Sequence, residues 1–173
     1  MKFFVSLLIF GLGLVSWPSR AQPSTQDMTV EVLGVYFTPP ANAAAAIVKA
    51  IDDSEREVLV QAYGFTHNVI AQALVRAHAR GVKVRVLLDQ KSQTSNRFVI
   101  AVLQDADIAV RQDGKHAIAH NKVMVIDQEV VITGSFNFTN SAATRNAENF
   151  LILKSPDLAL QYRLQWQNHW AHG

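Results

Sequence analysis

The sequence predicts an α/β fold in which a mixed β-sheet is sandwiched between helices on both of its faces. Strand-like and helix-like segments alternate from residue 29 to residue 170, and such alternation produces a sheet covered by helices on both sides. Two apolar runs, at residues 123–126 and 129–132, meet at a polar turn and predict a hairpin. Because a hairpin adds antiparallel strands, we expect a mixed sheet rather than a purely parallel one.

The first elements follow from apolar runs and turn residues. Residues 29–37 form a strand-like run, and Pro39-Pro40 starts a turn after it. Residues 41–53 are rich in alanine, which favours helix more than any other residue. Residues 57–63 form a second strand-like run. The sequence therefore predicts a strand, a helix and a strand in succession.

The next helix carries terminal signals at both ends. Thr66 is a plausible N-cap, the helix runs to about Arg80, and Gly81 closes it. The remaining expected elements are strands at 83–88, 107–111 and 149–153, and helices at 95–104, near Asn140 and at 156–170.

The hairpin carries the most informative residues of the chain. Alternate residues of a strand share one face, so His120 and Lys122 are expected to point the same way. Asp127, seven residues after His120, is expected on the opposite face at the strand end, in a structural or turn role. With a two-residue loop, His120 would pair with Ser135 or Asn137, which places both of these on the face of His120 and Lys122.

This combination of side chains suits phosphate chemistry. A histidine can attack phosphorus, and a lysine can neutralise phosphate oxygens. A lone His-x-Lys is usually an exposed strand edge, but here Gly134-Ser135-Phe136-Asn137 follows at the end of the next apolar run. Burying several polar side chains on one face costs free energy unless they serve a purpose. The pattern therefore indicates a site.

The motif His120-x-Lys122-x4-Asp127 resembles the signature of the phospholipase D superfamily. The stretch HNKVMVIDQEVVITGSFNFTNSAATRNAENF resembles the small bacterial endonucleases of that superfamily, which carry one motif per chain. The resemblance covers most of the chain after the first thirty or so residues and is strongest from His120 to Glu148 and in the closing LQWQNHW. It implies a phospholipase D-like fold. The superfamily also includes lipid-cleaving members, so the motif indicates phosphodiester chemistry more strongly than one substrate.

One motif supplies one histidine, whereas attack followed by protonation of the leaving group needs two. A two-fold homodimer would supply the second, and the resemblance implies such a shared active site. His120 of one subunit would then be the nucleophile and His120 of the other the general acid. The other site residues that the resemblance indicates are Lys122 and Asn137 on the phosphate oxygens, Glu148 as the carboxylate that orients the histidine, Ser135 as a further member, and Asp127 and Gly134 as structural members of the motif.

The N-terminus is expected to be a cleavable signal peptide over residues 1–21, leaving one domain at 22–173. Lys2 precedes an apolar stretch, and Ser19-Arg20-Ala21 supplies the small residues of a cleavage site. A retained membrane anchor is the alternative. Cleavage would place the protein in the periplasm or outside the cell, with no stable membrane association.

Charge and composition limit the kinds of binding and catalytic site that the chain can form. Losing Lys2 and Arg20 lowers the Lys and Arg count from 16 to 14, equal to the 14 Asp and Glu residues, so phosphate affinity must come from local clusters. The chain has no cysteine, which excludes thiolate catalysis and cysteine-ligated metals. His116 and His120 are four residues apart, but the region is strand-like and lacks the His-Glu-x-x-His pattern. We therefore expect neither a cofactor nor a metal ion.

Three functions remain open. The leading hypothesis is a metal-independent, largely non-specific endonuclease that cleaves nucleic acid, chiefly DNA, through a phosphohistidine intermediate. The first alternative is a phospholipase D that acts on phosphatidyl head groups, for which an apolar rim would be expected. The second is a non-catalytic nucleic-acid-binding module, for which a nucleophile would be unnecessary.

Overall fold

A computed structural model describes residues 28–39 and 42–173 of the chain. The signal peptide expected over residues 1–21 lies outside the described residues and stays a prediction. Among the residues that the structure describes, no helix has both the length and the apolar character needed to cross a bilayer.

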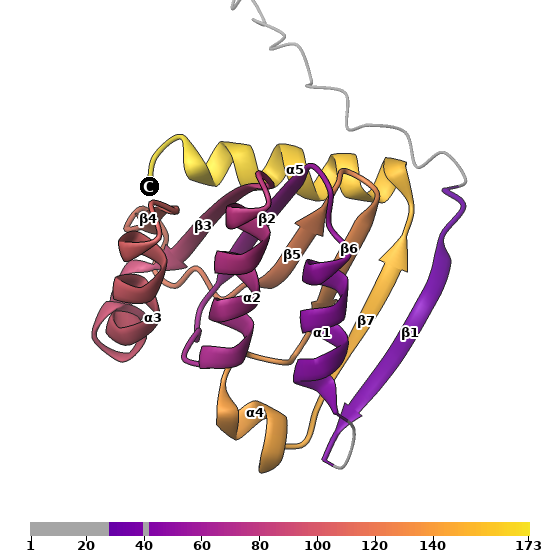
Figure 1. Cartoon of the computed structure of the whole chain (residues 1–173), viewed down its shortest axis with the longest axis horizontal. Coiled ribbons are helices and arrows are strands. Elements are labelled where there is room, and N and C mark those ends of the chain that lie inside the picture. The colour runs from indigo at the N-terminus through magenta and orange to yellow at the C-terminus, as the bar shows by residue number, and fades with distance from the viewer. Residues whose placement is uncertain (1–27, 40–41) are drawn as a thin grey trace, which may run out of the picture.

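Seven strands form one mixed sheet in the spatial order β1-β7-β6-β5-β2-β3-β4 (Figure 1). Strands β2, β3 and β4 run parallel to one another, whereas β5, β6, β7 and β1 run antiparallel to every strand that they pair with. The strands are β1 (Glu31–Thr38), β2 (Glu57–Ala62), β3 (Lys83–Asp89), β4 (Ala109–Asp113), β5 (Lys122–Ile126), β6 (Val130–Gly134) and β7 (Glu148–Lys154).

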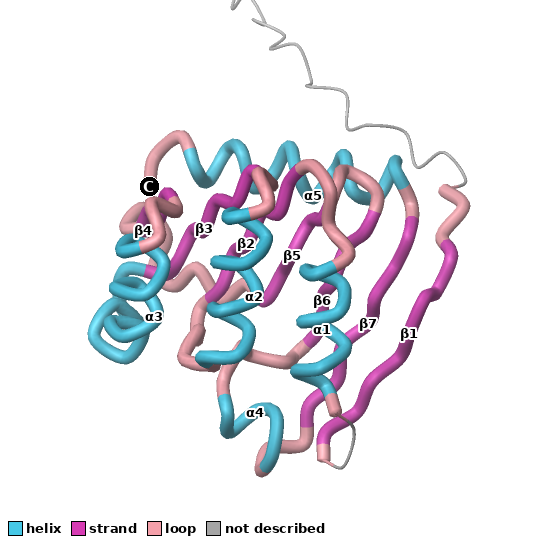
Figure 2. Tube along the Cα trace, viewed as in Figure 1, coloured by secondary structure: helices cyan, strands magenta, loops and turns pink. Residues whose placement is uncertain are grey.

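Helices cover both faces of this sheet, as the sequence predicts. Helices α1, α2 and α3 lie over one face, α5 crosses the other, and α4 lies beyond one edge (Figures 1 and 2). The helices are α1 (Ala43–Asp52), α2 (Asn68–Ala79), α3 (Gln93–Asp105), α4 (Asn140–Thr144) and α5 (Pro156–Trp170), with a short 3-10 turn at Gln90–Ser92 before α3.

Alternation along the central strands divides the core into two layers. Met124 and Ile126 of β5 join the layer under α1, α2 and α3, whereas Val123 and Val125 join the layer under α5. Trp166 of α5 is buried in the second layer, and its indole N–H donates to the Val60 carbonyl at 2.9 Å. Both faces of the central strands are therefore apolar because both are covered, which confirms the predicted fold class.

The hairpin between β5 and β6 turns over three residues, Asp127 to Glu129, and not over two. Asp127 and Gln128 have φ angles of 52° and 62°, and the Glu129 N–H donates to the Ile126 carbonyl at 3.0 Å. Ile126 pairs with Val130, so the register differs by one residue from the two-residue loop that we predicted. If this register continues, Ser135 and Asn137 do not pair with His120 and do not share its face of the hairpin. The predicted shared face was therefore wrong.

Helix α2 also begins later than predicted. Thr66 is not its N-cap, because the N–H groups of both Thr66 and His67 donate to the Phe138 carbonyl, at 3.0 and 2.9 Å. The helix therefore starts at Asn68, with His67 as N-cap. Its predicted end is confirmed, since Gly81 has a φ of 92° directly after the C-cap.

Candidate active site

The candidate site residues gather along the row where one end of each central strand lies, which we term the sheet edge. At this edge β2, β6 and β1 end while β5 and β7 begin, because Ala62 pairs with Lys122 and Thr38 pairs with Glu148. Antiparallel pairing thus brings residues from distant parts of the chain to one place. His120, Lys122, Ser135, Asn137 and Glu148 all lie in or directly beside these strand ends.

His120 and Lys122 both lie close to one aromatic ring, that of Tyr63. The His120 ring is exposed, and its centroid is 4.8 Å from that of Tyr63. The Lys122 ammonium lies 5.5 Å from the Tyr63 centroid and donates to the His120 carbonyl at 3.1 Å. Sequence analysis missed Tyr63, whose only signal is its position directly after an apolar strand. The arrangement presents an exposed histidine ring beside a fixed cation.

Lys122 is a buried ionisable residue. Its side chain is only 8% exposed, and burial lowers its pKa from the usual value near 10.5, while the negative charge of Glu148 acts in the opposite direction. An ammonium that has lost most of its water interacts more strongly with a phosphate oxygen than an exposed one does. Burial at this position therefore favours anion binding at a cost in stability.

Ser135 and Glu148 form the second part of the site. The Ser135 hydroxyl donates to the Glu148 carboxylate at 2.6 Å, and the Asn146 amide donates to its other oxygen at 3.1 Å. Within the described part of the chain these are the hydrogen-bond partners of Glu148, and His120 is not among them. The expected role of Glu148 in orienting a histidine therefore stays a prediction for a site assembled from two chains.

Asn137 anchors the loop that follows β2. Its side-chain oxygen accepts from the Gly64 N–H at 3.4 Å, and the Phe138 N–H donates to the Gly64 carbonyl at 3.0 Å. The fully buried Asn96 holds the same loop, because it donates to the Tyr63 carbonyl and accepts from the Phe65 N–H, both at 2.8 Å. These contacts fix Tyr63 beside His120.

Asp89 holds the segment that carries His120. It is 1% exposed and accepts from the Ala119 N–H at 2.7 Å and from the Ser92 N–H at 3.1 Å. Its position at the end of β3 brings the residue before His120 to the same sheet edge. Sequence analysis missed both Asp89 and Asn96, whose bonds join residues about 30 positions apart.

Asp127 lies at the opposite end of β5 from His120. Its carboxylate accepts from the N–H groups of Glu55, Arg56 and Glu57 at 2.9, 2.7 and 2.8 Å, directly where β2 begins. These contacts fix the hairpin turn against the central strand. Asp127 therefore has the surroundings of a structural residue and not of a reacting one.

Other aromatic and basic residues pack in the core or form ion pairs. Phe136, Phe138 and Phe150 are at most 2% exposed and pack in the core. Among the basic side chains, Arg76 and Arg80 pair with Asp52, and Arg85 pairs with Glu57. Asp52 serves two arginines, so these ion pairs offset only part of the positive charge.

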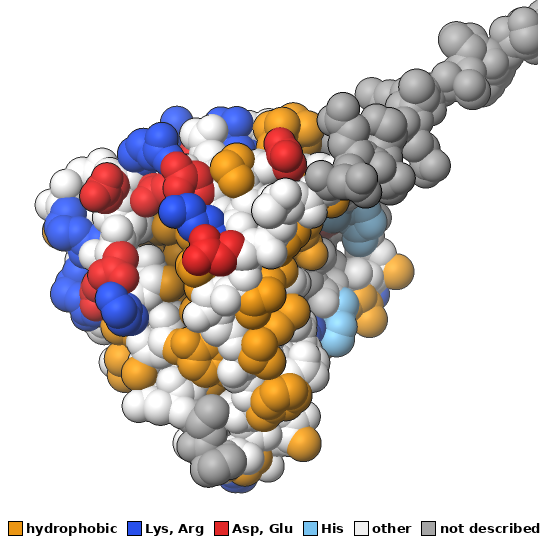
Figure 3. All heavy atoms as spheres, turned by 90° about the vertical axis from the view of Figure 1, so that its right-hand side faces the viewer, with side chains coloured by type: hydrophobic (Ala, Val, Ile, Leu, Met, Phe, Trp, Pro, Cys, Tyr) orange, Lys and Arg blue, Asp and Glu red, His pale blue; other side chains and the backbone are white. Residues whose placement is uncertain are grey.

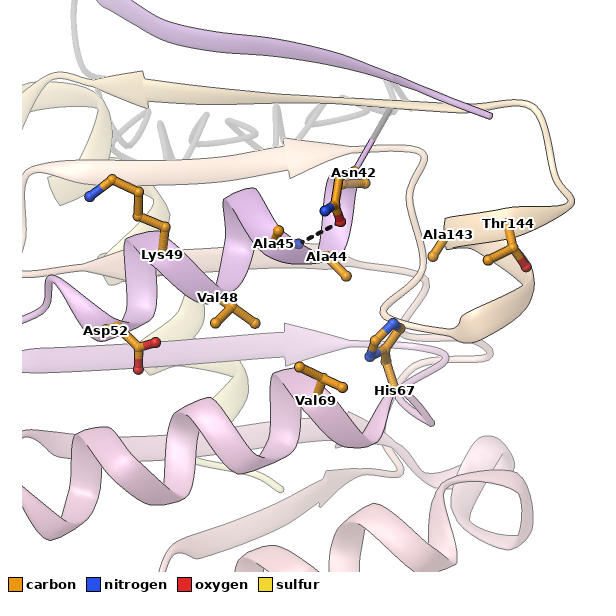
Figure 4. Close-up of a pocket in the computed structure, with 11 residues that line it drawn as sticks. Asn42, Ala44, Ala45, Val48, Lys49, Asp52, His67, Val69, Ala143 and Thr144 are labelled. Carbon is orange, nitrogen blue, oxygen red and sulfur yellow. Dashed lines mark hydrogen bonds between the residues drawn. The ribbon is translucent and has the colours of Figure 1, made fainter. Parts of the chain in front are cut away.

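A groove lies between the N-terminal ends of α1 and α2 and helix α4 (Figure 4). Its lining is mainly apolar, with Val48, Val69 and Ala143 among the lining residues, and His67 faces it. His67 is 8% exposed, and burial lowers its pKa. A neutral imidazole in an apolar wall is a packing residue, so this groove adds nothing to the chemistry of His120.

Replacing Lys122 by methionine is expected to stabilise the fold at pH 7, by about 1 kcal/mol. The lowered pKa means that the folded state holds the lysine proton less tightly than the unfolded chain does. The cost of the buried charge is therefore present at pH 7 and is relieved only as pH rises from the folded pKa towards 10.5. Urea denaturation would measure the change, with the half-exposed Lys154→Met as control, and a less stable Lys122→Met would contradict it.

Residues 47–170 match the family described as "Cardiolipin synthase, PLD-like domain". A protein named "Phospholipase D" from Rickettsia conorii is 47% identical over 145 residues, which cover 84% of this chain and 72% of that protein. A "Mitochondrial cardiolipin hydrolase" from Chlamydomonas reinhardtii is 31% identical over 120 residues, 69% of this chain and 54% of that protein.

One solved structure shares both sequence and fold with this chain. It is the phospholipase D family member Nuc from Salmonella typhimurium, with 34% identity and a TM-score of 0.80. The match covers 84% of this chain and 97% of that one. The seven-stranded sheet and its helices are therefore the architecture of a known protein of the same family.

Proposed function

Since this chain belongs to the phospholipase D superfamily and is a hydrolase of the phosphodiesterase kind, we propose that it is a metal-independent endonuclease acting chiefly on DNA. The observation that carries the proposal is the exposed ring of His120 beside the buried ammonium of Lys122. A nucleophile at an open sheet edge can be reached by a phosphodiester in the middle of a polymer. The half-exposed Tyr63 ring beside it offers a surface for an unstacked base.

The reaction would proceed in two displacements at phosphorus. In the first, a ring nitrogen of His120 forms a bond to phosphorus as the bond to the leaving oxygen breaks, and a general acid gives that oxygen its proton. In the second, water attacks the phosphohistidine, passes a proton to the same group and frees His120. Lys122 would hold the phosphate oxygens as negative charge develops on them.

The general acid would be His120 of a second copy of the chain. Among the described residues, the ring beside His120 is Tyr63 and not a second histidine, and Glu148 is engaged by Ser135 and Asn146. A two-fold dimer would bring two exposed His120 rings to one phosphate and thereby complete the site. In that assembly Glu148 and Asn137 of both copies would border the phosphate.

A phospholipase D acting on phosphatidyl head groups is the second candidate. Several relatives carry the names phospholipase D and cardiolipin hydrolase. The protein also exposes apolar side chains along β1, where Val32, Val35 and Phe37 are 57%, 52% and 64% exposed (Figure 3). Ile118, two residues before His120, is 53% exposed. These side chains are the kind of apolar rim that a membrane substrate would require.

Two substrates presented in excess EDTA would separate the two functions. We expect the purified protein to nick supercoiled plasmid DNA under these conditions and to release little choline from phosphatidylcholine vesicles. Agarose gels would follow the DNA, and an enzymatic choline assay would follow the lipid. The same reactions with added Mg²⁺ or Zn²⁺ serve as the metal-dependent comparison.

Each outcome decides between the candidates. Choline release without DNA nicking would overturn the endonuclease and favour the phospholipase. DNA nicking only after a divalent ion is added would refute the metal-independent mechanism. DNA binding without cleavage of either substrate would leave the binding module as the function.

A further inference from the structure

A second polar cluster lies where strand β4 ends beside the C-terminal end of α5 (Figure 1). It contains Asp113 and His116 from the end of β4 and the turn after it, and His169 and His172 from the end of α5 and the residues beyond it. None of these four residues has a role in the proposed cleavage reaction. The cluster joins parts of the chain more than 50 residues apart.

Three of these side chains are close enough to share one ion. Asp113, His116 and His172 each offer a ligand atom, and these atoms lie within 4.8 Å of one another. The Asp113 carboxylate is completely buried and lies 2.8 Å from His116 Nδ1. The rings of His116 and His172 have centroids 5.5 Å apart.

Asp113 and His116 share one hydrogen bond, between Asp113 Oδ2 and His116 Nδ1 at 2.8 Å. One oxygen of Asp113 accepts from the N–H groups of Lys115 and His116, at 3.1 and 3.3 Å, and this fixes the carboxylate with its other oxygen towards the histidines. The His172 Nδ1 atom is buried and has no hydrogen-bond partner in the described part of the chain. A buried ring nitrogen without a partner costs free energy, which a metal ion would recover.

His169 is a neighbour of this group and not a ligand. Its Nδ1 lies 2.6 Å from the Gln61 amide and its Nε2 lies 2.7 Å from the Gln165 amide, so both ring nitrogens are engaged. Its ring centroid lies 4.6 Å from that of His116 and 5.7 Å from that of His172. His169 therefore packs against both candidate ligands and restricts their movement.

We propose that Asp113, His116 and His172 bind one divalent transition-metal ion, with Zn²⁺ as the representative ion. Two imidazoles and one carboxylate are ligands that zinc accepts, and three protein ligands leave a fourth position for water. Tetrahedral ligands at zinc lie about 3.3 Å apart, so ligand atoms that are now up to 4.8 Å apart must approach one another by up to about 1.5 Å. His172 can make that movement because it lies beyond the end of α5.

The ion would tie the turn after β4 to the segment after α5. The same turn leads to His120, so the cross-link would also steady the segment that carries the nucleophile. This site is separate from the reaction at His120, because neither His120 nor Glu148 is among its ligands. Its role would be structural, and its test is independent of whether the protein cleaves DNA.

Isothermal titration with ZnCl₂ tests the site directly. The protein, first treated with EDTA and then dialysed free of it, is expected to bind one equivalent of Zn²⁺. His172→Ala and His116→Ala are expected to weaken binding at least tenfold, the typical minimum effect of disturbing a metal site. His78→Ala, which removes a histidine of α2 far from the cluster, is the matched control and should bind as the wild type does.

A thermal scan supplies an independent reading. Saturating Zn²⁺ should raise the melting temperature of the wild type and of His78→Ala by several degrees, because an ion that binds only the folded state stabilises it. His172→Ala should show no such rise. The proposal is overturned if the wild type binds no Zn²⁺, or if His172→Ala and His116→Ala bind as tightly as the wild type.

Discussion

Replacing His120 by alanine is expected to lower the rate of DNA cleavage at least about a thousandfold. The change removes the group that would form the bond to phosphorus, and among the described residues the aromatic neighbour of the His120 ring is Tyr63 and not a second histidine. The His120 ring is exposed and its aromatic contact is with Tyr63, so its loss should leave the melting temperature nearly unchanged. Activity and stability should therefore separate cleanly in this variant.

Plasmid nicking in EDTA and a thermal scan would measure these two properties on the same preparation. His78→Ala is the matched control, since it removes a half-buried histidine from α2, and it should keep its activity. A His120→Ala protein that retained more than a tenth of the wild-type rate would exclude His120 as the nucleophile. Full retention of function would favour the non-catalytic binding module.

Mixing the two proteins extends the same prediction to the shared site. If each reaction needs His120 from both subunits, only dimers of two wild-type chains are active. After subunit exchange, activity should follow the square of the wild-type fraction, so that about a quarter of the dimers in an equal mixture are active. Activity that follows the wild-type fraction itself would mean that each chain carries a complete site.

The sequence predicted most of the fold because its local signals were consistent. Alternating strand-like and helix-like segments gave the correct element types, and the hairpin gave the mixed sheet. The errors arose where a contact or a turn in the fold overrode a local sequence signal. The Thr66 and His67 N–H groups bond to Phe138, 72 and 71 residues away, and this contact delays the start of α2. No pattern within a single helix could reveal that partner.

The hairpin error shows how sensitive a face assignment is to loop length. Asp127 and Gln128 both adopt a left-handed conformation, and the loop contains one more residue than predicted. A shift of one residue reverses which side chains share a face. The site residues nevertheless lie at one edge, because each of them is at or directly beside the first or last residue of a strand.

Long-range polar contacts could not be predicted from the sequence, for a different reason. Asp89 and Asn96 reach backbone groups near His120 and Tyr63, but a buried aspartate or asparagine has no characteristic spacing. The same limit hid the second cluster. Sequence spacing associated His116 with His120, whereas the fold brings His116 beside His172.

Replacing Gly134 by alanine is expected to lower the free energy of unfolding by about 3 kcal/mol. A Cβ atom at this position would lie 2.3 Å from the Asn149 carbonyl oxygen and 2.6 Å from the Phe150 Cα. Both atoms belong to the backbone of β7, so relief would require the two strands to separate. Separation would in turn strain the bonds from the Ser135 and Phe136 N–H groups to the Asn149 carbonyl.

Gly81→Ala is the informative control for this variant. Its φ of 92° disfavours alanine, but its added Cβ would meet no atom within 4 Å, so its cost is conformational only, about 1 kcal/mol. Urea denaturation of both variants would measure the difference. An equal loss in the two would show that β6 and β7 can move apart at little cost. A larger loss in Gly134→Ala, together with reduced cleavage in the fraction that stays folded, would show that this glycine sets the approach of Ser135 to Glu148 and thereby the shape of the site.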